Sequence, residues 1–196
     1  MPANITDKTA LRKTLFMKRA LDHKVMDSMV LHDRLAKKIL FLVRAWQTQH
    51  GKKPIIAGYI PIRSEINTLP TLELLRTRGY TLCLPYVPKK DVPLMFLHFE
   101  GDLIDGAFGA KTPPLEAARM APDFLLVPLV GWDQRAQRLG YGGGYYDRSL
   151  QYLRAKGMGY ALGLAYDAQE TQCVPTEATD EPLNALLTPT RYFNWA

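Results

Sequence analysis

The chain has 196 residues, of which 47% are hydrophobic, 22% charged and 10% aromatic. These proportions are those of a soluble globular protein, and they exclude a disordered, collagen-like or coiled-coil chain. The apolar runs are too short to span a bilayer, and the first twenty residues lack the apolar core of a secretory signal. We therefore expect a cytoplasmic protein with no membrane partner.

The net charge of +6 is distributed unevenly. Residues 1–55 contain twelve Lys or Arg and four acids, so this segment carries +8 and the remainder −2. Such an excess suits an anionic partner, although a solvated helical surface would have the same composition. Cys83 and Cys173 lie outside any CxxC spacing and the four histidines show no ligand spacing, so we expect neither a disulfide nor a transition-metal site.

Two helices are predicted at the start of the chain. Thr6-Asp7 offers an N-cap for the first, and the second is predicted from about Val25 to Trp46, before the breakers Gly51 and Pro54. Apolar residues recur at helical spacing in both, at Leu11, Leu15 and Leu21 in the first and at Met29, Leu35, Ile39, Leu42 and Trp46 in the second.

The period then changes to short apolar runs that are typical of buried strands. A helix at 72–77, closed by Gly79, separates the first two of these runs. The predicted strands are 55–60, 80–84, 94–99, 124–130, 160–165 and a short one at 185–187. Strands that alternate with helices predict one α/β domain over residues 1–196, with a largely parallel sheet in three layers.

A glycine-rich loop, residues 140–144, lies between a buried strand and an amphipathic helix that carries Tyr146, Leu150 and Leu153 on one face. Glycines allow a sharp turn and bring backbone N–H groups close to a ligand, and a helix N-terminus is an anion site. Asp147 stabilises the first turn of such a helix, and beside phosphates it is placed to hold magnesium.

Two familiar phosphate-binding motifs do not fit this loop. No Lys followed by Ser or Thr comes after the glycines, as a G-x-x-x-x-G-K-[ST] loop requires. A G-x-G-x-x-G motif that starts at Gly140 would need glycine at position 145, where the chain has Tyr145.

The string from Arg138 to Arg148, R-L-G-Y-G-G-G-Y-Y-D-R, resembles the signature of the 5-formyltetrahydrofolate cyclo-ligases, also called methenyltetrahydrofolate synthetases. Further segments resemble that family in register along nearly the whole chain. They are Lys8-x-x-Leu11-Arg12, Ser64–Thr68, Val127–Asp133, Gly163–Tyr166, Val174-Pro175 and Thr179-Asp180.

The resemblance implies a mixed sheet like that of ribose-5-phosphate isomerase-like and CoA-transferase-like proteins, and an ATP- and Mg²⁺-dependent reaction on a folate substrate. It places Asp147 and Asp180 at the metal, and Glu65 with Tyr145 at the substrate. It implies ATP binding by Lys8, Arg12, Arg138, Leu139, Gly140, Tyr141, Gly142, Gly143, Gly144, Tyr145 and Tyr146. Phosphoryl transfer requires positioning more than a protein nucleophile, which fits a chain without a Ser/His/Asp or Cys/His arrangement.

Each of these residues also has a purely structural explanation. Lys8 and Arg12 share a helical face that would serve equally as a solvated basic surface, and Glu65 would serve as a surface acid near a helix. Asp147 would stabilise the helix dipole, and Asp180 would be a turn residue.

The chain departs from the family pattern at several positions. Some members carry Arg or Lys where this chain has Tyr141 and Gly143, so phosphate charge would come from Lys8, Arg12, Arg138 and Arg148. Thr179 and Asn184 replace a common His and Asp, and residues 112–114 lack an expected acidic element. Two alternatives therefore remain open, a related ATP-using enzyme with another substrate and a nucleic-acid-binding protein. The second is the weaker, because no RNA-binding motif is present.

Overall fold

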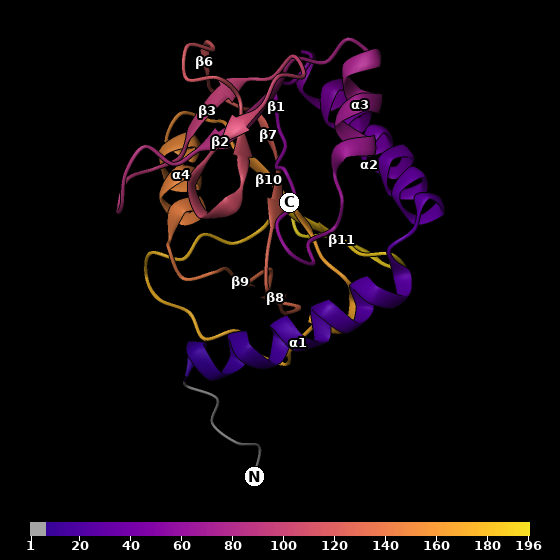
Figure 1. The fold of residues 1–196 in the computed structure, drawn as a ribbon, viewed down its shortest axis with the longest axis vertical. Helices are drawn as coiled ribbons and strands as arrows, with labels where there is room; N and C mark the ends of the chain where they lie inside the picture. Colours follow the sequence, from indigo (N-terminus) through magenta and orange to yellow (C-terminus); the bar gives the residue numbers. More distant parts are fainter. Residues whose placement is uncertain (1–6) are drawn as a thin grey trace.

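The computed structural model describes residues 7–196, and Figure 1 shows its fold. The helices are α1 (Lys8–Met26), α2 (Met29–His50), α3 (Leu69–Thr77) and α4 (Tyr145–Arg154), with short 3-10 turns η1 (Ala107–Gly109) and η2 (Asp167–Gln169). The first strands are β1 (Ile56–Ala57), β2 (Leu82–Tyr86), β3 (Met95–His98), β4 (Ile104–Asp105), β5 (Lys111–Thr112) and β6 (Arg119–Met120). The others are β7 (Phe124–Pro128), β8 (Gly131–Trp132), β9 (Arg138–Leu139), β10 (Tyr160–Leu164), β11 (Ala185–Leu187) and β12 (Tyr192–Asn194).

The main sheet has eight strands in the order β12-β11-β10-β7-β1-β2-β3-β6. Its centre is parallel, because β1 pairs in parallel with both β2 and β7, and β10 pairs in parallel with β7 and β11. The edges are antiparallel, formed by β12 on one side and by β3 and β6 on the other. The prediction of an α/β fold with a mixed, largely parallel sheet is confirmed.

Helices cover both faces of this sheet, which gives the three predicted layers (Figure 1). Residues of α2 and α3, such as Ile39 and Leu75, pack on one face against Leu126 and Leu162. On the other face, Leu150 and Leu153 of α4 belong to a second buried cluster. Strands buried on both faces explain the near-continuous apolar runs that the sequence shows.

The helix boundaries follow local capping. Asp7 accepts a hydrogen bond from the Thr9 amide and caps α1, whereas Thr6 of the predicted cap lies outside the described residues. Ser28 caps α2, so the second helix begins at Met29 and not near Val25 as predicted. Gly51 ends α2 in the left-handed conformation, where glycine carries no steric penalty.

Two apolar residues were wrongly assigned to buried stripes. Leu21 and Met29 are 65% and 88% exposed. The buried stripe of α1 instead continues from Leu11 and Leu15 to Arg19, which keeps the spacing of four residues. Arg19 is fully buried although it is charged.

The predicted strands exist, but several are shorter or shifted. The run at 55–60 pairs only as β1, and β2 starts two residues later than predicted. The sequence did not predict the short pairs β4–β5 and β8–β9, nor β6 and β12. Strands of two or three residues are too short to show an alternating pattern, so periodicity could not reveal them.

Helix α1 lies across the carboxyl end of the parallel strands, next to the β8–β9 hairpin (Figure 1). Leu11 and Leu15 pack there against Val130 and Leu139, and a side chain at Gly131 would collide with Leu15. No helix within residues 7–196 is both long and apolar enough to cross a membrane. The packing of Leu11 and Leu15 therefore fixes α1 over the carboxyl end of the parallel strands, where ligands of α/β proteins bind.

Candidate active site

The glycine loop connects β9 to the N-terminus of α4. Gly142 and Gly144 have φ angles of 102° and 63°, which residues with a Cβ rarely adopt. Gly144 is the N-cap of α4 and offers no side chain, so a ligand can approach the N–H groups of the first turn. The loop therefore has the backbone geometry of an anion site at a helix N-terminus.

Arg12 of α1 lies directly against this loop. Its Nε donates a 2.9 Å hydrogen bond to the Gly140 carbonyl, across 128 residues of sequence. A Cβ added at Gly142 would lie 3.4 Å from the guanidinium carbon of Arg12. The other two nitrogens of Arg12 make no hydrogen bond within residues 7–196, so they remain donors for a bound anion.

Lys8 lies one helical turn before Arg12 and contacts the C-terminal part of the chain. Its ammonium group is 2.8 Å from a carboxylate oxygen of Glu177 and 2.9 Å from Asp180. Burial is the largest single influence and lowers the pKa of Lys8, but the hydrogen bonds and charges of the two carboxylates together raise it above its ordinary value. Lys8 therefore stays positively charged beside the predicted metal ligand Asp180.

Arg138 and Asp147 form a second ion pair at the base of the loop. The Arg138 Nη2 donates to Asp147 Oδ1 at 2.7 Å, and the Glu181 amide donates to the same oxygen at 3.1 Å. The Arg138 side chain is 4% exposed and that of Asp147 is 20% exposed. Burial lowers the pKa of Arg138, although Asp147 opposes the shift. This pair fixes the start of α4 to the segment that carries Asp180.

The two acids fit a magnesium ion that arrives with phosphates better than a protein-built metal cage. No group of three or more His, Cys, Asp or Glu in the described part of the chain could hold a metal. Asp147 accepts its two hydrogen bonds through Oδ1, and Asp180 accepts its two through Oδ2. Within residues 7–196 each acid thus keeps one oxygen for a cation, and Mg²⁺ characteristically binds one or two carboxylates together with substrate phosphates.

Glu65 follows β1 and is buried on the far side of the loop. Its Oε2 accepts a hydrogen bond from the Ile62 amide at 2.9 Å, and its Oε1 accepts one from the Tyr141 hydroxyl at 2.8 Å. Burial raises the pKa of Glu65, while these hydrogen bonds and the nearby Arg19 oppose the rise. Burial also raises the pKa of Tyr141 to about 12, so its hydroxyl remains a donor at neutral pH.

Sequence reasoning missed Arg19 as a member of this site. Its side chain is 1% exposed, and Arg19 Nη1 lies 3.8 Å from Glu65. Other donors of Arg19 bond to the hydroxyls of Ser64 at 3.1 Å and Tyr141 at 2.8 Å. The signal was present in the sequence, because Arg19 continues the apolar stripe of Leu11 and Leu15, where a cation requires buried partners.

The remaining predicted residues divide between core and loop. Leu139 is buried in the core, and Tyr146 packs against the cluster beneath α4 with Arg138 5.9 Å from its ring. Tyr145 instead lies by the loop, with its ring beneath Gly143. The two tyrosines thus separate into one on the sheet and one at the loop, as the helical geometry predicts.

The departures from the family pattern have local structural explanations in two cases. Asn184 accepts hydrogen bonds from Arg154 and from the Ala161 amide, so it joins β10 to the C-terminal segment. Thr112 is buried and donates to the Pro85 carbonyl at 3.3 Å. Thr179 is exposed in the turn before Asp180.

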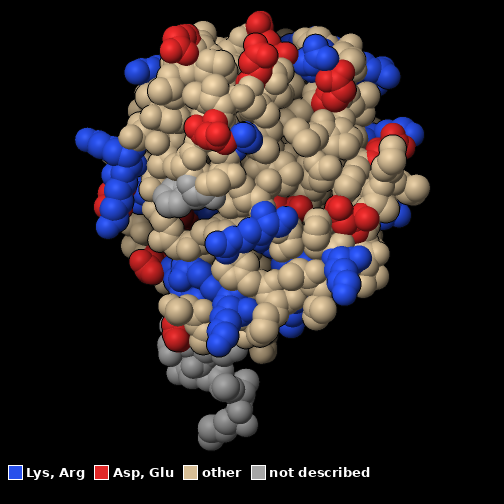
Figure 2. All heavy atoms as spheres, viewed as in Figure 1, with Lys and Arg blue, Asp and Glu red and all other residues tan. Residues whose placement is uncertain are grey.

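Lysine and arginine are numerous over the part of the surface that α1 occupies (Figure 2). The exposed cations of this helix include Lys13, Lys18 and Lys24, in addition to the loop-facing Lys8 and Arg12. The positive field over the carboxyl end of the sheet would attract an anionic ligand.

Comparison with known proteins gives one consistent result. Residues 4–189 match the model of the 5-formyltetrahydrofolate cyclo-ligase family. The chain is 33% identical over 150 residues to the 5-formyltetrahydrofolate cyclo-ligase of Escherichia coli K12, covering 71% of this chain and 80% of that protein. It is 35% identical over 139 residues to the enzyme of the same name from Haemophilus influenzae, covering 67% and 74%.

Solved structures of similar proteins share the fold. The 5,10-methenyltetrahydrofolate synthetase of Aquifex aeolicus superposes with a TM-score of 0.73 at 29% identity, covering 95% of this chain and 92% of that one. The 5,10-methenyltetrahydrofolate synthetase of Mycoplasma pneumoniae superposes with a TM-score of 0.65 at 27% identity, covering 92% and 97%.

Proposed function

The chain belongs to the 5-formyltetrahydrofolate cyclo-ligase family, and we propose that it uses ATP and Mg²⁺ to convert 5-formyltetrahydrofolate into 5,10-methenyltetrahydrofolate, with release of ADP and phosphate. It acts as a carbon–nitrogen ring-forming ligase. We also propose that it works as a single domain over residues 1–196 in the cytoplasm.

The chemical difficulty of this reaction is the formyl oxygen. An N-formyl group is a resonance-stabilised amide, so its oxygen is a poor leaving group. Transfer of the ATP γ-phosphoryl group forms an O–P bond, breaks the bond to ADP and makes this oxygen a good leaving group. The second folate nitrogen then attacks the formyl carbon and closes the ring. Loss of that nitrogen's proton and departure of phosphate with the C–O bond electrons give the methenyl product.

The observation that carries the ATP proposal is the contact between Arg12 and the glycine loop. Because Arg12 holds the Gly140 carbonyl through Nε alone within residues 7–196, its other two nitrogens remain as a bidentate donor pair beside Gly142, in the loop that leads into α4. Lys8, one turn away, adds a second fixed positive charge. Phosphoryl transfer depends on such positioning and on neutralisation of charge.

Magnesium would be held by Asp147 and Asp180. Each carboxylate keeps one oxygen for the ion, and each is oriented by a cation of the protein, Arg138 for Asp147 and Lys8 for Asp180. When bound, the ion neutralises charge on the transferring phosphate. These residues orient and bind, and no residue of the chain is required to form a covalent intermediate.

Glu65 would recognise the folate. Its buried carboxylate is a strong acceptor for the N–H donors of a pterin ring, and it is positioned by the Ile62 amide and by Tyr141. Because Tyr141 belongs to the glycine loop, the proposed folate contact and the proposed phosphate contact share one hydrogen-bonded unit. Tyr145, at the loop, would contact the substrate ring.

A spectrophotometric assay for methenyl-folate formation tests this proposal directly. Turnover should require 5-formyltetrahydrofolate, ATP and magnesium together, and ADP should appear in equal amount. Full activity without ATP, or in excess chelator, would contradict the proposed chemistry. Hydrolysis of ATP with other formylated pterins but not with this folate would identify a different substrate.

A further inference from the structure

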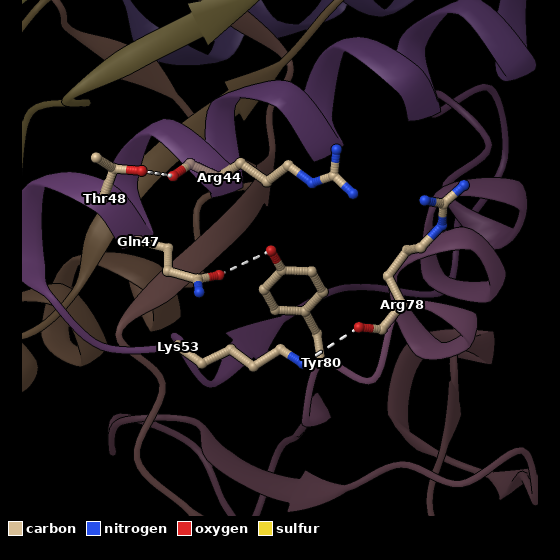
Figure 3. Close-up of a pocket in the computed structure, with 6 residues that line it drawn as sticks. All are labelled: Arg44, Gln47, Thr48, Lys53, Arg78 and Tyr80. Carbon is tan, nitrogen blue, oxygen red and sulfur yellow. Dashed lines mark hydrogen bonds between the residues drawn. The ribbon is translucent and has the colours of Figure 1, made fainter.

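A second polar hollow lies at the opposite end of the sheet from the glycine loop. Its volume is about 380 Å³, and Figure 3 shows the side chains around it. The lining comes from the end of α2, the segment before β1, the end of α3 and the segment before β2. The six lining residues are Arg44, Gln47, Thr48, Lys53, Arg78 and Tyr80.

The charge of this hollow is one-sided. Arg44, Lys53 and Arg78 come from three different segments, and no carboxylate lines the space between them. The guanidinium ends of Arg44 and Arg78 extend toward the same side of the hollow (Figure 3). Within residues 7–196 neither guanidinium group makes an ion pair or a hydrogen bond with the protein.

The floor of the hollow is held in place by hydrogen bonds. Tyr80 is buried and donates from its hydroxyl to the Gln47 side-chain oxygen at 3.0 Å, which leaves the Gln47 amide group as a donor. Lys53 Nζ lies 4.7 Å from the centre of the Tyr80 ring and donates to the Arg78 carbonyl at 3.2 Å. The guanidinium groups of Arg44 and Arg78 therefore lie beside a floor whose side chains are held by hydrogen bonds.

Helix dipoles explain only part of this arrangement. Cations are favourable near helix C-termini, and the bond from Lys53 to the Arg78 carbonyl at the end of α3 is such a contact. Arg44, however, lies more than one turn before the end of α2 at His50, beyond the reach of this effect. Its approach to Arg78 gives like-charge repulsion unless an anion lies between them.

We propose that this hollow binds the phosphate group of a small molecule. Two guanidinium groups and one ammonium group provide the forked and point-charge donors that a phosphate dianion accepts. The volume suits a small metabolite, at the lower end of the range for ligand pockets. The neighbouring cations Lys52 and Arg76 are already paired with Asp123 and Glu73, so the unpaired charge is confined to the hollow. A nucleic acid strand would require a longer basic track.

The test follows the backbone amides of residues 47–53 and 78–80 by NMR during titration with inorganic phosphate, and with chloride at equal ionic strength. Phosphate should give saturable shifts at these amides and chloride should not. The R44Q/R78Q variant should weaken phosphate binding there at least about tenfold, because charged hydrogen bonds are lost. The control R76Q removes a cation two residues away that is paired with Glu73, and it should bind phosphate as the wild type does.

The glycine loop is a second potential phosphate site, and it reports separately through the amides of residues 140–144. R12Q should weaken shifts there and leave those at the hollow unchanged, whereas R44Q/R78Q should do the reverse and keep the rate of methenyl-folate formation. If ATP does not bind at the glycine loop, the proposal of a phosphate site in the hollow is unaffected. If phosphate does not bind in the hollow, the ATP proposal is unaffected. Titration with glycerol phosphate in parallel distinguishes an organic phosphate ligand from inorganic phosphate.

Three results would overturn the proposal. They are shifts that do not saturate, shifts that are equal in chloride, and binding that R76Q weakens as much as R44Q/R78Q. A further titration tests whether single-stranded oligonucleotides bind through the same two arginines. If their affinity increased with length, the ligand of the hollow would be a nucleic acid, and the proposal of a small molecule would be wrong.

Discussion

The hydroxyl of Tyr141 donates a 2.8 Å hydrogen bond to Glu65, which lies 76 residues earlier in the chain. Tyr141 is in the glycine loop, and Glu65 follows the first strand of the sheet. Arg19 from α1 donates to Tyr141 as well and lies 3.8 Å from Glu65. Three segments that lie far apart in the sequence thus meet in one hydrogen-bonded unit, in which Arg19 and Glu65 are buried.

Tyr141→Phe should weaken binding of both substrates. The change removes the donor to Glu65 and the acceptor for Arg19 while it preserves the ring, so the KM values for folate and ATP should each rise by several-fold. The free energy of unfolding should fall by about 1 kcal/mol, the usual value of one hydrogen bond. Tyr152→Phe is the matched control on the exposed face of α4, and it should change neither. A change in folate KM alone would show that the loop and Glu65 act independently.

Glu65→Gln should make the protein less active and should change how its stability depends on pH. Because burial raises the pKa of Glu65, the folded protein holds this proton more tightly than the unfolded chain does. The stability that the carboxyl contributes is fully present below about pH 4.3, the unfolded value, and is lost as the pH rises through the folded pKa. Urea unfolding across this window should therefore show the variant gaining stability over the wild type as the pH rises. A constant difference would mean that Glu65 titrates normally.

Lys8→Gln should raise the KM for ATP about tenfold, as expected for one lost charged contact. Its partners Glu177 and Asp180 hold its charge in place on the loop side of α1. Lys13→Gln removes a charge from the exposed surface of the same helix and is the control for the general field. If both variants raised the KM for ATP equally, Lys8 would contribute only to the general positive charge of the surface.

Gly142→Ala should impair ATP binding beyond the cost of backbone strain. The new Cβ would lie 3.4 Å from the Arg12 guanidinium carbon, in a backbone conformation with φ of 102°. Gly157→Ala carries similar strain at a φ of 71°, but no atom lies within 4 Å of its Cβ. Both variants should lose about 1–2 kcal/mol of stability, while only Gly142→Ala should raise the KM for ATP. If the two variants had the same KM for ATP, the glycine loop would not bind the nucleotide.

Asp147→Asn should lower turnover by orders of magnitude and shift the dependence of turnover on magnesium. It should also destabilise the fold by about 1–3 kcal/mol, because the buried Arg138 loses its charged partner. Asp180→Asn, whose partner Lys8 is more exposed, should show the magnesium effect with less loss of stability. Loss of stability with an unchanged magnesium curve would make Asp147 purely structural.

Much of the fold was predictable because its signals are local. The apolar runs of the central strands and the capped helices have periods that a short window reveals. The Lys8–Arg12 spacing gave a shared helical face for the same reason. The pairing of β3 was not predictable, since parallel and antiparallel strands have the same apolar pattern when both faces are buried.

The sequence singled out candidate residues for the site but could not give the contacts between them. The glycine spacing marked the loop, but the ion pair of Lys8 with Asp180 joins residues 172 positions apart. Arg19 depends on Ser64, Leu129 and Tyr141 for its hydrogen bonds, and no local pattern specifies partners at such separations.

The same long-range contacts set the order of events during synthesis. Among the described elements α1 is made first, yet Lys8 has no carboxylate partner until Glu177 and Asp180 are made, about 10 to 30 s later at usual translation rates. Arg19 likewise lacks its hydrogen bond to the Tyr141 hydroxyl until Tyr141 is made. The apolar stripe of α1 likewise lacks its packing partners Val130, Leu139 and Val174 until they are made, so it is open to chaperones and proteases during that interval.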